Sequence, residues 1–491
     1  MEKELETLKT NNTWELVPCP KEVKPLETRW VYKIKKDNND FIYKSRYVAK
    51  GFEQIYGLNY LETFASVIKQ MAWKLVFAIA ALYNLIIYKI DMISAFTQGD
   101  VDSIIYIKQP EGFINSKYPN HVLKLNKALY GLKQSARVWY STLKPILIKL
   151  SFKVLDSKPC IFINKCKNII ICLYVDDLAV LAPNIKVFNN FAKDIKKYFK
   201  ITNLKEIKDY LRVNIKQTKD YININQNDYI NKMLNKFELN NIYIKNTPMD
   251  SNIKLEPNLN KASQSDITKF QRLIGSLLYL MLCTRPDIAF PVIKLARFAN
   301  NPSNIHFKAV YRVFAYLKGT INLGITYYKK GNKFITGFCD SDYAGDFITA
   351  KSTSGFIFLL ACGVISWKSK LQSIIAQSST EAEYISLSLA AKEAIFLKTL
   401  LEELGFYNQI KLPIYCDNNG AIELANNPKF HERTKHIAVK YHFIRDLINK
   451  NIIELIYINT SDQKADGLTK ALDRVKFNKF LNLINLKDSF N

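Results

Sequence analysis

The sequence is poor in glycine and proline, and it contains no long apolar run. Its 491 residues include 16 glycines and 15 prolines, and 48% of them are hydrophobic, so the chain can bury large cores and is not mainly disordered. No apolar stretch reaches the roughly 18 residues that a membrane span needs. The amino-terminal segment MEKELETLKTNN lacks the apolar core of a secretory signal. These absences predict a protein of the cytoplasm or the nucleus that is not secreted and has no membrane partner.

Paired cysteines and negative charge are also scarce. The eight cysteines form no C-x-x-C pair and match no histidine spacing, which argues against a disulfide framework and a structural zinc site. Lysine and arginine total 70 against 44 aspartates and glutamates, a formal net charge of +26. This excess favours a nucleic-acid partner. An alternative stays open, because an AT-rich coding sequence also gives a composition rich in lysine, isoleucine and asparagine without selection for binding.

A basic hairpin is predicted near the amino terminus. Residues 26–52 read as two strands joined by a turn at 36–40, because turn-forming residues separate two runs rich in β-formers. On the second strand Lys44, Arg46 and Lys50 recur at even spacing, which predicts one shared face. Three cations on one face suit a run of phosphates, although an ordinary solvated strand face has the same pattern.

Aspartates interrupt the apolar segments of the first half of the chain. Residues 70–90 are predicted to form a buried helix that runs into a strand delivering Asp91. Residues 168–183 form an apolar run that contains Asp176 and Asp177. Burying two like charges without partners costs several kcal/mol, so this pair is expected at a hairpin tip or on bound cations. Three converging carboxylates could hold two divalent cations for phosphoryl transfer, but spacing alone leaves the convergence open.

The second half of the chain predicts a linker followed by further folded regions. Residues 240–266 are rich in Asn, Pro, Ser and Asp, which indicates a linker and a domain boundary near residue 250. Residues 270–319 have helical periodicity. The last third alternates strand patterns with helical patterns that start near Ser379 and Val439, which is typical of an α/β domain of about 150 residues.

Motifs along most of the chain identify a resemblance to a known family. The segments that carry it are WELVPCP, KSRYVAKGFEQ, YLETFASV, IDMISAFTQGDVDSIIYIKQPEGF, KLNKALYGLKQSARVWY, CLYVDDLAVLA, GSLLYLMLCTRPDIAF, YLKGT and KSTSGF. In this order they resemble the reverse transcriptase and ribonuclease H region of the Pol polyprotein of copia-type long-terminal-repeat retrotransposons. The resemblance implies an RNA-directed DNA polymerase with ribonuclease H activity on RNA:DNA hybrids, working by two-metal phosphoryl transfer.

The fold implied by the resemblance is a multidomain α+β and α/β architecture. A right-hand polymerase with fingers, palm and thumb would occupy residues 1–245, a linker and helical connection residues 246–330, and a ribonuclease H-like α/β domain residues 331–480. The implied partners are an RNA template, a DNA primer, their RNA:DNA hybrid and deoxynucleoside triphosphates (dNTPs). The implied cofactor is Mg²⁺, two ions per active site, with Mn²⁺ as an alternative, and the implied setting is a cytoplasmic virus-like particle. Template, primer and oligomeric state stay open.

The resemblance also implies roles for residues of the polymerase site. The metal-binding triad would be Asp91, Asp176 and Asp177. The cations that hold the triphosphate would be Lys44, Arg46 and Lys50. Phe96 matches the aromatic residue that blocks a ribose 2′-hydroxyl, and its alternative role is that of a core phenylalanine. Gln134 matches a glutamine near the incoming nucleotide, and its alternative role is that of a surface amide.

A second set of acidic residues matches the ribonuclease H domain of the family. The four positions are Asp340, Glu383, Asp417 and Asp466. Glu381 competes with Glu383, since both fit a helix capping box. Helical geometry favours Glu383, which lies above Leu387 and Ala390 on the face expected to meet the sheet. Asp342 and Asp346 are close enough in sequence to be confused with Asp340, and no role is assigned to the histidines at 431, 436 and 442.

Some residues depart from the family pattern. They are Ser66 in place of proline, Arg212 in place of glycine, and Ala350 and Ala438 in place of charged residues. Arg212 is of most concern, because a glycine can adopt backbone conformations that arginine cannot. The departures keep two alternatives open: a catalytically decayed or domesticated nucleic-acid-binding relict, and a structural interaction protein whose positive charge is incidental.

Overall fold

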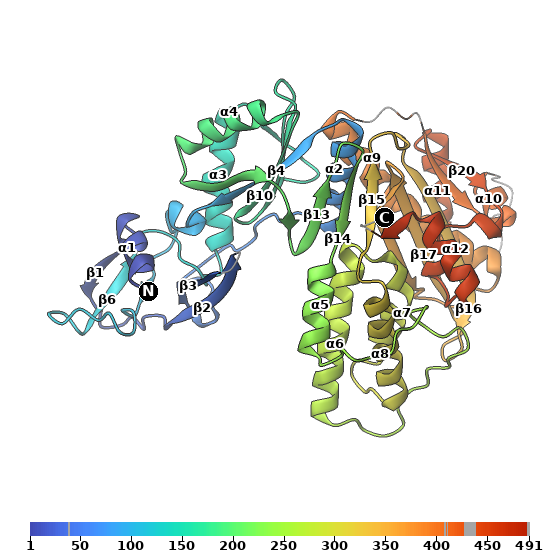
Figure 1. Ribbon diagram of the computed structural model, residues 1–491, viewed down its shortest axis with the longest axis horizontal. Coiled ribbons are helices and arrows are strands. Elements are labelled where there is room, and N and C mark those ends of the chain that lie inside the picture. The colour runs from blue at the N-terminus through green and yellow to red at the C-terminus, as the bar shows by residue number, and fades with distance from the viewer. Residues whose placement is uncertain (38–39, 407–408, 410, 427–437, 489–491) are drawn as a thin grey trace. The chain divides into compact units, whose positions relative to one another are not determined.

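The computed structural model describes residues 1–491 except 38–39, 407–408, 410, 427–437 and 489–491 (Figure 1). The chain divides into two compact units. The first unit comprises Met1–Ile68 and Tyr88–Glu206, and the second comprises Lys69–Ile87 and Ile207–Asn491. Each unit is thus built from segments that are separated in the sequence. The functional boundaries expected at residues 245 and 330 stay predictions.

A six-stranded sheet in the order β11-β4-β10-β9-β8-β7 forms the centre of the first unit. Its strands are β4 (Ile86–Met92), β7 (Lys153–Val154), β8 (Ile161–Asn164), β9 (Ile169–Tyr174), β10 (Asp177–Ala182) and β11 (Ile201–Glu206). The predicted hairpin with an aspartate pair at its tip is confirmed, because Tyr174 at the end of β9 pairs with Asp177 at the start of β10. All residues of these two strands except Tyr174 and Asp177 are buried, which explains the apolar run.

Two helices flank this sheet. They are α3 (Ser135–Lys149) and α4 (Ile185–Lys196). Helix α4 packs against β10 and β11, and its Phe188 ring stacks on Tyr88 of β4 with ring centres 4.2 Å apart. The helix thereby covers the strand that carries Asp91.

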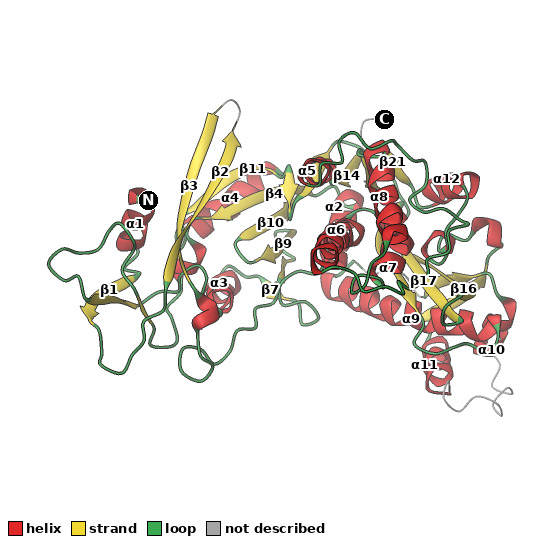
Figure 2. Ribbon diagram, turned by 90° about the horizontal axis from the view of Figure 1, so that it is seen from below, coloured by secondary structure: helices red, strands yellow, loops and turns green. Residues whose placement is uncertain are grey.

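The amino-terminal part of the first unit contains a small sheet and a long two-stranded ribbon (Figure 2). The small sheet has the order β1-β6-β5, with β1 (Trp14–Pro18), β5 (Tyr106–Ile107) and β6 (His121–Leu125), and α1 (Glu2–Thr10) precedes it. The ribbon pairs β2 (Thr28–Asp37) with β3 (Asp40–Ala49), which confirms the predicted hairpin. Positions 38–39 of its turn lie outside the described residues. A core that includes Leu26, Tyr47 and Ile105 joins the base of the ribbon to the small sheet.

The second unit begins with a helix, and in the sequence this helix comes before the strands of the six-stranded sheet. Helix α2 (Gln70–Leu82) was predicted to be buried, and every residue from Ala72 to Leu82 is. It packs against β14, β15 and β18. The sheet β12-β13-β14-β15-β21 lies in this unit, with β12 (Asp209–Tyr210), β13 (Val213–Gln217), β14 (Tyr221–Asn225), β15 (Leu323–Tyr328) and β21 (Leu486–Asp488).

A helical region follows β14. Its helices are α5 (Asn227–Lys236), α6 (Gln264–Cys283), the short η3 (Pro286–Ile288), α7 (Ala289–Ala296) and α8 (Asn304–Gly319). Residues 240–263, all of which are described, form no helix or strand, whereas the last residues of the predicted linker, 264–266, form the start of α6. Among the described residues, no helix combines the length and the apolar character needed to cross a membrane.

The last part of the second unit is the predicted α/β region. Its sheet has the order β18-β17-β16-β19-β20, with β16 (Thr336–Asp346), β17 (Lys351–Leu360), β18 (Gly363–Leu371), β19 (Leu412–Cys416) and β20 (Ile453–Tyr457). Strands β16 to β18 are antiparallel, whereas β19 runs parallel to both β16 and β20. Helix α9 (Ser379–Leu404) packs across β16, β17 and β19 and contacts α10 (Asn419–Asn426) and α11 (Ala438–Asn449). The short η4 (Thr460–Asp462), η5 (Asp466–Leu468) and α12 (Arg474–Leu483) follow.

Candidate functional site

Three aspartates meet at the centre of the six-stranded sheet. Asp91 lies near the end of β4, and Asp177 opens the neighbouring strand β10. Asp176 lies in the turn between β9 and β10. Burial raises the pKa of Asp177, Lys89 lowers it, and the charges of Asp176 and Asp91 raise it further, with a net rise. The predicted triad is therefore brought together, and this crowding of like charges suits a bound cation.

Lys89 lies between two of these carboxylates. Its Nζ is 3.7 Å from Oδ1 of Asp91 and 3.6 Å from Oδ1 of Asp177. Lys89 and Asp91 are two residues apart on β4, so their side chains leave the same face of the strand. The sequence reading missed Lys89, although the Lys-x-Asp spacing on a predicted strand could have indicated it.

The turn that carries Asp176 has an unusual backbone. Val175 has φ of 54°, a left-handed conformation that is rare for a β-branched residue. The indole Nε1 of Trp139, on α3, donates a hydrogen bond of 2.7 Å to the carbonyl oxygen of Val175. The Trp139 side chain is fully buried. A rigid helix thus fixes a strained turn next to the carboxylates, which is where strain is commonly found at functional sites.

The ring of Tyr130 joins the triad to two other predicted site residues. Phe96, in η2 (Ala95–Gln98), meets this ring edge to face at 4.7 Å. The guanidinium of Arg46, on β3, lies 4.6 Å from the ring centre. Burial raises the pKa of the Tyr130 hydroxyl, Arg46 lowers it and Asp176 raises it, so both charges are near. Phe96 is partly exposed rather than a core residue, and Tyr130 was missed by the sequence reading.

The structure places two of the three predicted cations on one exposed face of the ribbon. Lys44 and Arg46 lie on β3 opposite Lys33 and Val31, on one exposed face. Lys50 follows the end of β3, and its backbone at φ −81° and ψ 74° is no longer extended. Its N–H still donates a bond of 2.8 Å to the carbonyl oxygen of Glu27, just before β2, and its place on that face stays a prediction.

Gln134 is buried, so the reading of it as a surface amide is wrong. Its side chain has no exposed surface. Its Oε1 accepts a bond of 3.0 Å from Nε2 of Gln54, and its Nε2 donates a bond of 2.9 Å to the carbonyl of Asn59. Both bonds join Gln134, which lies at the start of α3, to the segment that follows the ribbon. The amide thereby ties that segment to the helix.

A second carboxylate cluster gathers around β16, the central strand of the α/β region. Its members come from β16, α9, the end of β19 and η5: Asp340, Glu383, Asp417 and Asp466. Burial raises the pKa of Asp340, and the charge of Asp466 raises it further. Thr469 donates a hydrogen bond to Asp340, and Lys470 forms an ion pair with Asp466. The structure thus gathers all four predicted positions.

Glu383, rather than Glu381, faces this cluster. The backbone N–H of Ser341 donates to Oε1 of Glu383 at 2.9 Å. Burial, with the nearby charge of Asp340, raises the pKa of Glu383. Glu381 instead accepts a bond of 2.8 Å from the N–H of Gln377, while its own N–H bonds to the hydroxyl of Ser378. Glu381 therefore caps the start of α9.

A thiol adjoins the second cluster. Among the residues that the structure describes, one group of ligand atoms is compact enough to hold a metal ion: Glu383, Cys416 and Asp417, whose atoms lie within 4.8 Å of one another. The hydroxyl of Thr460 donates to Asp417 at 2.8 Å. Carboxylates so close together repel one another, and a divalent cation relieves that repulsion. The cluster therefore fits a divalent ion, and Cys416 was missed by the sequence reading.

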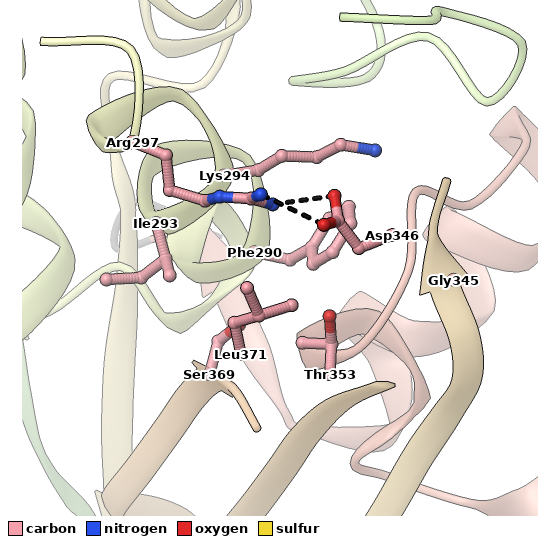
Figure 3. Close-up of a pocket in the computed structure, with 9 residues that line it drawn as sticks. All are labelled: Phe290, Ile293, Lys294, Arg297, Gly345, Asp346, Thr353, Ser369 and Leu371. Atoms are coloured by element: carbon pink, nitrogen blue, oxygen red, sulfur yellow. Dashed lines mark hydrogen bonds and ion pairs between the residues drawn. The ribbon is translucent and has the colours of Figure 1, made fainter. Parts of the chain in front are cut away.

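Asp346 is engaged elsewhere and is distinct from Asp340. Figure 3 shows a pocket where α7 meets the strands, with the guanidinium of Arg297 directed at the carboxylate of Asp346. The two hydrogen bonds measure 2.7 and 2.9 Å. Burial raises the pKa of Asp346, but Arg297 and Thr349 lower it below its ordinary value. A carboxylate held this way belongs to a structural ion pair. The pKa of Asp342 is instead raised, mainly by burial.

Arg212 occupies the kind of backbone position that favours glycine. Leu211 and Arg212 form the two-residue turn between β12 and β13, with φ of 49° and 58°. Positive φ at both positions is typical of a type I′ turn, in which glycine or asparagine is preferred. The concern raised by the sequence has a physical basis. His431 and His436, which were assigned no role, lie outside the described residues.

Comparison with known proteins identifies relatives over the whole chain. Residues 11–251 match the family described as Reverse transcriptase (RNA-dependent DNA polymerase). The chain is 36% identical to the Retrovirus-related Pol polyprotein from transposon TNT 1-94 of Nicotiana tabacum, over 99% of this chain and 37% of that protein. It is 38% identical to the corresponding polyprotein from transposon RE1 of Arabidopsis thaliana, over 97% of this chain and 33% of that protein. The chain thus spans about a third of the length of these relatives.

A shorter relative and a solved structure extend the comparison. The chain is 32% identical to the transposon Ty5-1 protein of Saccharomyces cerevisiae, over 62% of this chain and 99% of that protein. A foamy viral protease-reverse transcriptase, solved in complex with double-stranded DNA, matches with a TM-score of 0.52 and 13% identity over 94% of this chain and 70% of that chain. This likeness supports the expected mixed polymerase and ribonuclease H-like fold. The chain belongs to the reverse transcriptase family of copia-type retrotransposon Pol polyproteins.

Proposed function

We propose that the chain is an RNA-directed DNA polymerase of a copia-type retrotransposon and that it also cleaves the RNA of RNA:DNA hybrids. The observation that carries the proposal is the meeting of Asp91 and Asp177, on adjacent strands, with Asp176 in the turn before β10. Arg46 and Tyr130 lie beside them. Family membership supports the polymerase part. The net charge of +26 supports a nucleic-acid partner.

At the polymerase site, each residue has a part that follows from its position. Asp91 and Asp177 present oxygen ligands from rigid strands, and Asp176 does so from the turn fixed by Trp139. Divalent ions held there would lower the pKa of the primer 3′-hydroxyl and stabilise the pyrophosphate leaving group. Arg46, on the ribbon face it shares with Lys44, would bind the triphosphate.

Substrate selection and the ions complete this proposal. The ring of Phe96, held edge-on by Tyr130, would exclude a ribose 2′-hydroxyl and so select dNTPs. Gln134 would act indirectly, by holding the segment that follows the ribbon. Mg²⁺ is the proposed ion, two per site, with Mn²⁺ as a substitute, because both accept carboxylate and phosphate oxygens.

The second cluster supports the ribonuclease H part of the proposal. Asp340, Glu383, Asp417 and Asp466 supply carboxylates from four separate elements. Divalent ions held there would activate a water molecule for attack on an RNA phosphate. Thr469 and Thr460 orient Asp340 and Asp417 through their hydroxyls, so the ligands are fixed before an ion arrives.

The wider setting is part of the same proposal. The partners would be an RNA template, a DNA primer and their hybrid, and the functional borders would be those expected near residues 245 and 330. The compartment would be the cytoplasm, with the nucleus as an alternative. A decayed nucleic-acid-binding relict is the second candidate, and the observation that favours it is Arg212 at a positive φ of 58°.

Primer extension tests the proposal. The purified chain is given a poly(rA)/oligo(dT) hybrid, dTTP and Mg²⁺, and we expect extension that Asp176→Asn reduces by at least about a thousandfold, because a metal ligand is lost. The matched control is Asp156→Asn in the same unit, whose exposed side chain should be dispensable. A folded chain that binds the hybrid in a salt-sensitive manner without extending it would favour the relict.

A further inference from the structure

The polymerase site contains a cation of its own. Lys89 points its ammonium between Asp91 and Asp177, at 3.7 and 3.6 Å from one oxygen of each. The exposed side-chain fractions are 20% for Lys89, 34% for Asp91 and 36% for Asp177. Water therefore screens this arrangement only in part, and the charges act on one another more strongly than surface charges do.

The arrangement of the carboxylates agrees with an ammonium between them. Among the described residues, the ligand atoms of the second cluster include a group close enough together to hold a metal ion. The described carboxylates of the polymerase triad do not form such a group. Lys89 also lowers the pKa of Asp177, against the effects of burial and of Asp176 and Asp91. The ammonium thus offsets repulsion among three carboxylates that would otherwise face one another.

The same charge opposes a divalent ion. Three carboxylates and Lys89 give the site a formal charge of −2, and two divalent ions would bring it to +2. Even at the dielectric of bulk water, a unit charge about 5 Å from a divalent ion weakens its binding by about fivefold or more after screening by salt. The negative charges of a nucleotide triphosphate would offset this excess.

We propose that Lys89 is a positioning residue that links metal loading to nucleotide binding. Its ammonium holds Asp91 and Asp177 in place before ions arrive, and it weakens ion binding until a triphosphate is present. The inference rests on the proposed polymerase function and deepens it, because it makes the site's affinity for divalent ions depend on the substrate.

Mn²⁺ binding, followed by electron paramagnetic resonance on the full chain, tests this without turnover. The ion bound at the polymerase site is the fraction that Asp177→Asn removes. Without nucleotide, Lys89→Met and Lys89→Gln should each lower the Mn²⁺ dissociation constant at this site by about fivefold or more. Lys89→Arg, which keeps the charge, and Lys193→Met, which removes an exposed lysine of α4, should leave it unchanged. When Mn²⁺ is offered as its complex with a non-hydrolysable dNTP analogue, which has a net negative charge, Lys89→Met should no longer bind the ion more tightly than wild type.

The outcomes separate the two proposals. An Mn²⁺ site that Asp177→Asn removes, but whose affinity is unchanged or weaker in both Lys89→Met and Lys89→Gln, overturns the role of Lys89 and leaves the polymerase proposal standing. Equal tightening in Lys89→Arg would also overturn it, because the effect would then not come from charge. No Mn²⁺ binding that depends on Asp177 would overturn both proposals. Using two neutral variants of different shape guards against a packing defect in either one.

Discussion

Asp287→Asn is expected to destabilise the second unit by about 3 to 5 kcal/mol, because it leaves a buried guanidinium without its counter-charge. The side chains of Arg285 and Asp287 are 0% exposed. Nε and Nη2 of Arg285 donate to the two oxygens of Asp287 over 2.7 to 3.2 Å. The hydroxyl of Tyr316 donates to the same carboxylate at 2.6 Å, and Thr320 accepts from the guanidinium.

The magnitude follows from what asparagine can and cannot replace. It keeps the volume of Asp287 and one acceptor oxygen, so packing changes little. Two charge-assisted hydrogen bonds are lost or weakened, at about 1.5 to 3 kcal/mol each. Arg285 cannot escape the loss by releasing its proton, because its pKa, which burial lowers, is raised on balance by Asp287 and Tyr316. The bonds to Thr320 remain and keep the loss within the stated range.

Urea unfolding followed by hydrogen exchange in α6 to α8 would measure this effect. Asp250→Asn is the matched control, because it breaks an ion pair to Arg312 whose side chains are 47% and 27% exposed, and it should cost less than about 1 kcal/mol. The double variant Arg285→Met/Asp287→Leu should recover most of the lost stability, since it removes both charges. A loss below about 1 kcal/mol for Asp287→Asn, or one equal to that of Asp250→Asn, would refute the reasoning.

Three further outcomes are expected. Arg212→Gly should raise the free energy of unfolding by roughly 0.5 to 1 kcal/mol in urea titrations, because its φ of 58° strains any residue with a Cβ; a loss of stability would contradict this. Burial lowers the pKa of Lys74 to about 7. Between pH 7 and 10 the unfolded chain, in which Lys74 has its ordinary pKa, therefore binds more protons than the folded chain. Stability relative to Lys74→Met should therefore rise with pH over that range, by at most about 4 kcal/mol, and a flat difference would refute it. Asp346→Asn should keep cleavage of a labelled RNA:DNA hybrid, whereas Asp340→Asn should abolish it; the reverse would contradict the site assignment.

Local chemistry made much of the polymerase site predictable. Two adjacent aspartates in an apolar run are costly to bury, so they are expected at a hairpin tip. The β9–β10 hairpin could therefore be predicted. The roles of Tyr130 and Trp139 could not be foreseen, because they depend on which strands and helices become neighbours. Lys50 lies just beyond β3, which ends at Ala49, so its place on the shared face stays a prediction.

The second cluster was predictable from helical geometry and strand ends. Spacing on α9 placed Glu383 towards the sheet, and the structure directs its carboxylate at the N–H of Ser341. The sequence could not show that Cys416 would adjoin the cluster. Nor could it show that α2 belongs to the second unit, because an apolar helix does not reveal which surface buries it.

The most direct measurement follows both strands of one hybrid at once. RNA and DNA of a primed template carry different labels, and extension and RNA cleavage are read from the same reaction with Mg²⁺. Asp177→Asn should abolish extension and retain cleavage, whereas Asp340→Asn should do the reverse, because the two clusters use different carboxylates. Extension that persists in Asp177→Asn, or a wild-type chain that is folded and binds the hybrid but performs neither reaction, would contradict the account.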